Sequence, residues 1–182
     1  MTEDELKKIK DSFVRTDETG GASAACLMTA IKYYGGTTTW EQVKEWCKSE
    51  PGHAAHALTE AARRAGFTVV PDLMDIERLK KHDIPTILYM YNDFDRMNYA
   101  VCYGMHENRF IVWEPEWGPM QYWESELKTL WKYCIAYKLY PDRSIINPTL
   151  EWWQIDDWDR RLKHCMDRCK EFIELEILPR FR

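Results

Sequence analysis

The spacing of the hydrophobic residues changes near Gly66, and this change limits the folds that the chain can adopt. Before Gly66, apolar residues recur every three or four positions, as on the buried face of an α-helix. From Phe67 to Tyr140, short apolar runs alternate with polar turns rich in Asn, Asp and Gly, which is typical of β-strands. Helices followed by an antiparallel sheet form an α+β fold, which is the fold class that we predict.

The expected elements can be placed along the chain. A charged leader at residues 1–10 forms a short helix or a frayed end. The first buried helix ends at Gly35-Gly36, and the second begins at Thr39, where Gln42 completes a capping box. A third helix covers residues 55–65. The expected strands are 67–70, 86–91, 97–105, 109–114, 120–123 and 133–140, with short helices at 76–81 and 125–131.

A separate helical segment is expected at the C-terminal end. Asn147 is a helix cap and Pro148 fits the first helical position, so we predict a domain at residues 1–145 and a helical extension at 146–182. The apolar face of the extension either packs on the domain, closing a groove, or seats a partner such as a second copy in a homodimer. The aromatic candidates for this interaction surface are Trp152, Trp153 and Trp158.

The charge and hydropathy of the chain exclude several functional classes. The formal net charge is −5 and there is no basic run, which argues against nucleic acid as a partner. No apolar stretch is long enough to cross a bilayer, and residues 1–10 lack the apolar core of a signal peptide. These features predict a cytoplasmic protein.

The cysteine and histidine spacings do not predict a metal or cofactor. The six cysteines form no Cys-x-x-Cys pair and are expected to be reduced thiols in the cytoplasm. Two close pairs have spacings that metal ligands also use. No third ligand is evident beside the first pair, and the second, with His164 nearby, fits the apolar stripe of a helix equally well, so we expect no metal. These pairs are His53 with His56 and Cys165 with Cys169.

Short motifs in a fixed order resemble a known family. They are Ala25-Cys-Leu27 with Tyr33-Tyr-Gly35, Leu58 with Ala61-Ala62 and Gly66-Phe67, Pro85-Thr-Ile-Leu88, Asn98-Tyr-Ala-Val101, Val112-Trp-Glu-Pro115 and Leu139-Tyr-Pro141. In this respect residues 13–141 resemble the bacteriocin-processing peptidases, papain-like domains that cut leader peptides after a double glycine. The resemblance implies a papain-like cysteine peptidase fold, with N-terminal helices packed on an antiparallel sheet.

The catalytic positions implied by the resemblance hold other residues here. Such a peptidase needs a thiolate at a helix N-terminus, a histidine base, an acid that orients the histidine, and a donor for the oxyanion. The family's cysteine aligns with Ala22, its histidine with Asn98, its aspartate with Glu114 and its oxyanion glutamine with Thr16. Alanine has no nucleophilic atom and an asparagine cannot act as a general base, so the resemblance implies a catalytically inactive peptidase-like domain.

Three functional hypotheses follow. In the first, the domain is a pseudo-protease that binds a peptide or protein partner in the old groove. In the second, it is an interaction protein that works through the C-terminal helix. In the third, it is a hydrolase or acyltransferase that uses another nucleophile such as Cys26, although a thiol at this place usually packs in the core. Ser23 is expected to cap its helix. The groove candidates implied by the resemblance are Thr16, Asp17, Ala22, Ser23, Asn98 and Glu114.

Overall fold

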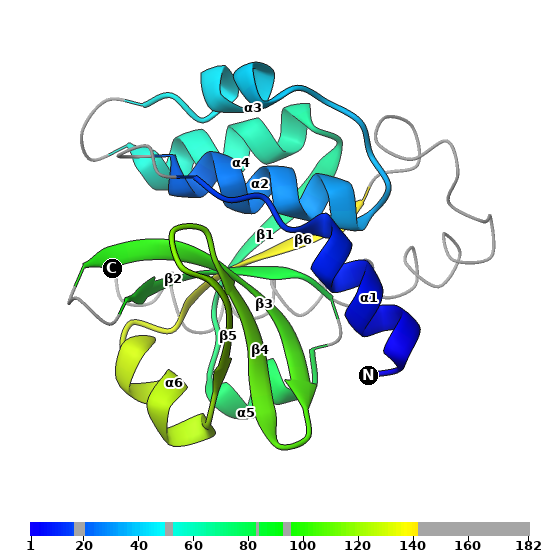
Figure 1. Ribbon diagram of the computed structural model, residues 1–182. Coiled ribbons are helices and arrows are strands. Elements are labelled where there is room, and N and C mark those ends of the chain that lie inside the picture. The colour runs from blue at the N-terminus through cyan, green and yellow to red at the C-terminus, as the bar shows by residue number, and fades with distance from the viewer. Residues whose placement is uncertain (17–20, 50–52, 83, 93–95, 142–182) are drawn as a thin grey trace, which may run out of the picture. The chain divides into compact units, whose positions relative to one another are not determined.

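The computed structural model describes residues 1–16, 21–49, 53–82, 84–92 and 96–141 (Figure 1). Its helices are α1 (Glu3–Ser12), α2 (Ala22–Tyr33), α3 (Trp40–Trp46), α4 (Ala54–Arg64), α5 (Ile76–Lys80) and α6 (Glu124–Leu130). Its strands are β1 (Phe67–Leu73), β2 (Thr86–Tyr91), β3 (Met97–His106), β4 (Arg109–Glu114), β5 (Gly118–Tyr122) and β6 (Ile135–Pro141). The predicted order of helices followed by strands is confirmed.

The strands form one antiparallel sheet with the order β1-β6-β2-β3-β4-β5. The strand that comes last in the sequence, β6, is inserted between β1 and β2, where Leu139 pairs with Val69 and Tyr137 with Ile87. Figure 1 shows α2, α3 and α4 gathered on one side of this sheet, with α5 and α6 on the other. The α+β prediction is therefore confirmed, with helices on both faces of the sheet.

Local signals explain where several helices begin. At α1, the Thr2 side chain accepts a hydrogen bond from the backbone of Glu5, and the Glu5 carboxylate accepts one in return from the Thr2 amide. At α3, Thr39 caps the helix by accepting from the Gln42 amide at 3.3 Å. The predicted capping box at α3 is wrong in its second half, because the Gln42 side chain accepts instead from the Thr38 hydroxyl at 3.0 Å.

Each face of the sheet has its own apolar core. On the face that carries α5 and α6, buried side chains of β2, β3 and β4 pack against Leu79 and Leu127 of the two helices. On the other face, α2 is buried along nearly its whole length, and Leu27 is fully inaccessible. Burial on both sides gives a firm support for the residues at the ends of the strands.

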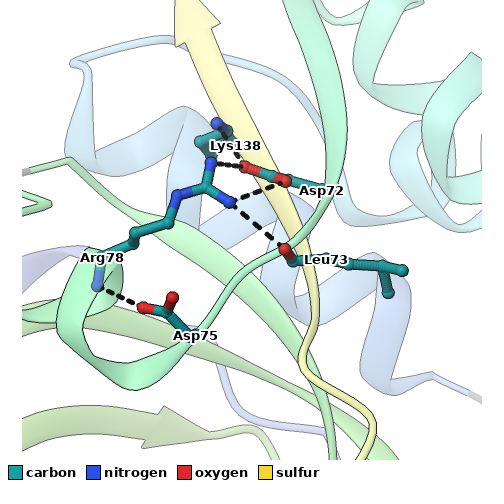
Figure 2. A network of polar contacts seen from close by, with 5 residues as sticks. All are labelled: Asp72, Leu73, Asp75, Arg78 and Lys138. Carbon is teal, nitrogen blue, oxygen red and sulfur yellow. Dashed lines mark hydrogen bonds and ion pairs between the residues drawn. The ribbon is translucent and has the colours of Figure 1, made fainter. Parts of the chain in front are cut away.

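A buried polar network links β1, β6 and α5 (Figure 2). The Lys138 ammonium lies 2.7 Å from the Asp72 carboxylate, and both side chains are almost inaccessible to water. The same carboxylate binds the Arg78 guanidinium at 2.6 Å, and Asp75 caps α5 by accepting from the Arg78 amide. This network joins the first and last strands to the helix beneath them.

Some predictions fall outside the described residues. They concern Asp17, the boundary at 145/146, the C-terminal helix and its aromatic candidates Trp152, Trp153 and Trp158. Within the described residues, no helix is long and apolar enough to cross a membrane.

Candidate functional site

A pocket of about 650 Å³ opens at the N-terminal end of α2, facing α3 and the start of β3. Three of the predicted groove residues lie in its wall: Ala22 and Ser23 from the first turn of α2, and Asn98 from β3. The other lining residues are Gly21, Ala24, Glu41, Lys44, Glu45, Cys47, Lys48, Ser49, Ala54, Tyr89, Met97 and Tyr99. The structure thus brings Ala22 and Asn98 into one pocket wall, although 76 positions separate them in the sequence.

Ala22 is the first residue of α2, which is the position where a papain-like nucleophile would sit. The helix dipole there would stabilise a thiolate, but the alanine methyl group offers no atom that can attack a carbonyl. Ser23 does not cap the helix as predicted, because it lies inside the first turn, after the N-cap residue Gly21.

The thiols near the pocket are held in their neutral form. Burial raises the pKa of Cys47 to about 12, although the hydrogen bond with Ser23 opposes this effect. Cys26 is completely inaccessible, and burial raises its pKa well above the ordinary value, with Cys47 and Glu114 adding to the shift. Since the thiolate is the reacting form, the structure speaks against Cys26 as a nucleophile. No histidine is among the residues that line the pocket in the described part of the chain.

The Asn98 carboxamide is fixed by two neighbours. Its nitrogen donates to the Glu116 carboxylate at 3.1 Å, and its oxygen accepts from the Tyr99 backbone amide at 2.9 Å. Glu114 is buried and accepts a hydrogen bond from the Tyr122 hydroxyl. The carboxylate bound to Asn98 therefore comes from Glu116, which the sequence did not single out.

Thr16 is buried beside the site, although it does not line the pocket. Its backbone amide donates to the Pro115 carbonyl at 3.1 Å, which ties the segment before α2 to the turn after β4. Just upstream, Phe13 stacks on Trp113 with ring centroids 3.9 Å apart, and the Trp113 indole donates to the Val14 carbonyl at 3.2 Å. These contacts hold residues 13–16 against β4 and the turn that follows it.

An aromatic wall borders the pocket on the sheet. Tyr89 of β2 and Tyr99 of β3 are directly paired across the strands, with ring centroids 5.0 Å apart, and both line the pocket. Tyr137 of β6 packs on Tyr99 with centroids 6.2 Å apart, which continues the wall. The sequence did not indicate a role for these residues, since alternating tyrosines in a strand predict only a partly buried face.

The described residues include no group of three or more His, Cys, Asp or Glu that could hold a metal ion. His53 and His56 are exposed at the start of α4, and Cys165 and Cys169 lie outside the described residues.

The fold is that of a papain-like cysteine peptidase domain. The chain belongs to the Peptidase C39 family, whose model matches residues 11–139. The predicted family is thus confirmed, while helix α1 lies almost wholly before the matched region.

Solved structures of similar fold include three peptidase domains. The peptidase domain of Streptococcus ComA, a bifunctional ABC transporter involved in a quorum-sensing pathway, has 23% identity and a TM-score of 0.63, over 71% of this chain and 98% of that one. A double-glycine-motif protease from an AMS/PCAT transporter, in complex with the leader peptide, has 24% identity and a TM-score of 0.62, over 71% and 90%. The peptidase domain of Streptococcus mutans ComA has 20% identity and a TM-score of 0.57, over 71% and 99%.

At this level of identity the likeness establishes the fold alone. No curated protein sequence matches the chain.

Proposed function

We propose that this chain is a catalytically inactive C39 domain that binds a peptide in the pocket at the start of α2. The observation that carries the proposal is that the pocket is present, with about 650 Å³ of space, around an alanine where the nucleophile would be. A thiol protease needs a thiolate and a base within reach of each other. Among the described residues that line the pocket, Cys47 supplies a neutral thiol and no histidine is present to act as its base.

The lining of the pocket suits a peptide. Tyr89, Tyr99 and Met97 supply apolar and aromatic surface, while Lys44 and Glu45 supply charges of both signs at its edge. Sites for organic ligands commonly combine such an apolar wall with a few polar groups. The solved domain that holds a leader peptide has the same fold, which supports a peptide as the ligand class. The described cysteines are all free, in keeping with a cytoplasmic location.

The test uses a synthetic leader-type peptide that ends in Gly-Gly, followed by a few residues. Isothermal titration calorimetry measures its binding to the full chain, and mass spectrometry of the same mixture detects cleavage. We expect binding to the native chain without any cleavage product. Lys48→Trp, which places an indole at the edge of the pocket, should weaken binding by about tenfold or more, and Ala22→Trp should act alike.

Lys32→Trp is the matched control, because Lys32 is exposed on α2 and does not line the pocket. Cleavage by the native chain would contradict the loss of catalysis. Equal binding by Lys48→Trp, Ala22→Trp and Lys32→Trp would show that the peptide binds elsewhere.

A further inference from the structure

We infer that the Asn98 carboxamide determines which ligands the pocket accepts, by pairing with one main-chain peptide group of an extended peptide. This inference rests on the proposed function and adds to it the chemical group that is recognised. It assigns a binding role to the residue that stands at the family's histidine position.

The contacts of Asn98 leave only one orientation for its side chain. The Tyr99 amide is a donor, so the atom 2.9 Å from it must be the carboxamide oxygen. The Glu116 carboxylate oxygen, 3.1 Å away, must in turn face the carboxamide nitrogen. Both hydrogen bonds thus assign the same orientation to the Asn98 carboxamide, and together they fix its plane.

The hydrogen-bonding sites that remain on the Asn98 carboxamide match those of a peptide group. A carboxamide has two N–H donors and an oxygen with two lone pairs. Glu116 uses one donor and the Tyr99 amide uses one lone pair, which leaves one N–H and one lone pair. A peptide group in an extended chain presents one acceptor and one donor, and Asn98 is partly exposed in the pocket wall.

The surroundings leave room for the main chain of a ligand next to this contact. Ala22 and Ser23 line the pocket with short side chains, so that main-chain atoms of a ligand can come close to α2. Tyr89 and Met97 offer contact area to the rest of the ligand. The ligand class is therefore an extended peptide whose main chain forms hydrogen bonds with Asn98.

The experiment measures binding of the same Gly-Gly leader-type peptide, together with a series in which single amides near the glycines are replaced by esters. An ester removes the N–H donor and weakens the carbonyl acceptor at one position without changing the side chains. For the native chain we expect one ester to weaken binding by about tenfold, whereas its neighbours have smaller effects. For Asn98→Ala we expect weaker binding of the parent peptide by about tenfold and no further loss with that ester.

Two variants separate recognition from a structural effect. Glu116→Ala removes the carboxylate that holds Asn98 but leaves the carboxamide in place, so it should weaken binding by only about threefold. Gln121→Ala removes an exposed carboxamide on β5, away from the pocket lining, and should bind like the native chain. Thermal melting of each variant confirms that it is folded.

If Asn98→Ala binds the parent peptide as tightly as the native chain, or if the ester series gives the same losses in both proteins, the inference is wrong while the proposed function stands. If the native chain binds none of these peptides, the proposed function fails, and the inference fails with it.

Discussion

The Asp72 carboxylate is the shared anion of the network in Figure 2, and its removal should destabilise the fold strongly. It contacts the Lys138 ammonium at 2.7 Å and the Arg78 guanidinium at 2.6 Å. The exposed fractions of the side chains are 3% for Lys138, 8% for Asp72 and 50% for Arg78. The two ion pairs therefore lie in different surroundings, one buried in the sheet and one at its surface.

The burial of each ion pair determines how much it contributes to the free energy of unfolding. Removing one partner of a buried ion pair costs about 3–5 kcal/mol, because the other charge has lost its counter-charge away from water. A surface pair contributes about 0–1 kcal/mol. We therefore expect Asp72→Ala to lower the free energy of unfolding by about 3 kcal/mol and Arg78→Ala by less than about 1 kcal/mol. Lys138→Met should cost less than Asp72→Ala, since it leaves the Asp72 carboxylate with the Arg78 guanidinium and fills the same space with an apolar side chain.

Urea unfolding followed by circular dichroism measures these differences. For a chain of this size, about 3 kcal/mol corresponds to a fall in Tm of roughly 6–12 °C, which thermal melting would detect as well. Asp72→Asn serves as the isosteric comparison, because it keeps the shape and removes the charge. The reasoning is refuted if Asp72→Ala costs no more than Arg78→Ala, since the buried contact would then add nothing to the exposed one.

Two further predictions concern the thiols and the catalytic positions. Burial raises the pKa values of Cys47 and Cys102 to about 12, so the folded chain keeps these protons above pH 9 while the unfolded chain releases them. Stability is then fully present below about pH 9 and falls by about 1.4 kcal/mol per pH unit for each thiol as the pH rises toward 12. Urea unfolding at pH 8 and 10.5 checks this, and Cys102→Ala should show a shallower fall than the native chain. Second, Ala22→Cys alone should not cleave the Gly-Gly peptide in a mass-spectrometric assay, because Asn98 cannot accept the proton of the thiol. Cleavage by this single variant would reveal a base outside the residues described for the pocket.

The limits of a strand were predicted well where turn-forming residues lie next to it in the sequence. Strands β2 and β4 have the expected limits, since Pro85 precedes the first and the turn at Glu107-Asn108, where φ is positive, precedes the second. Strand β1 was predicted too short, because Pro71 and Asp72 read as strand-ending residues. In the described sheet β1 is an edge strand, where a proline nitrogen needs no partner, and Asp72 turns inward to Lys138.

The candidate site was predicted only in part. Ala22, Ser23 and Asn98 could be placed together, because motif order carries over the positions of a helix start and a strand start. The partner of Asn98 could not be predicted, since it depends on how the turn after β4 presents Glu116 rather than Glu114. Nothing in the spacing of Cys47 indicated that it would border the pocket.

Several contacts near the pocket do not depend on the side chains that line it. Phe13 stacks on Trp113, and the Thr16 amide donates a hydrogen bond to the Pro115 carbonyl. None of these contacts involves the side chain of Ala22 or Asn98. A catalytic pair of thiolate and imidazolium must be held partly away from water, which costs stability, whereas an alanine and a hydrogen-bonded carboxamide carry no charge to desolvate. The contacts of residues 13–16 and the chemistry of Ala22 and Asn98 thus rest on different side chains, so the proposed binding role does not require a catalytic pair.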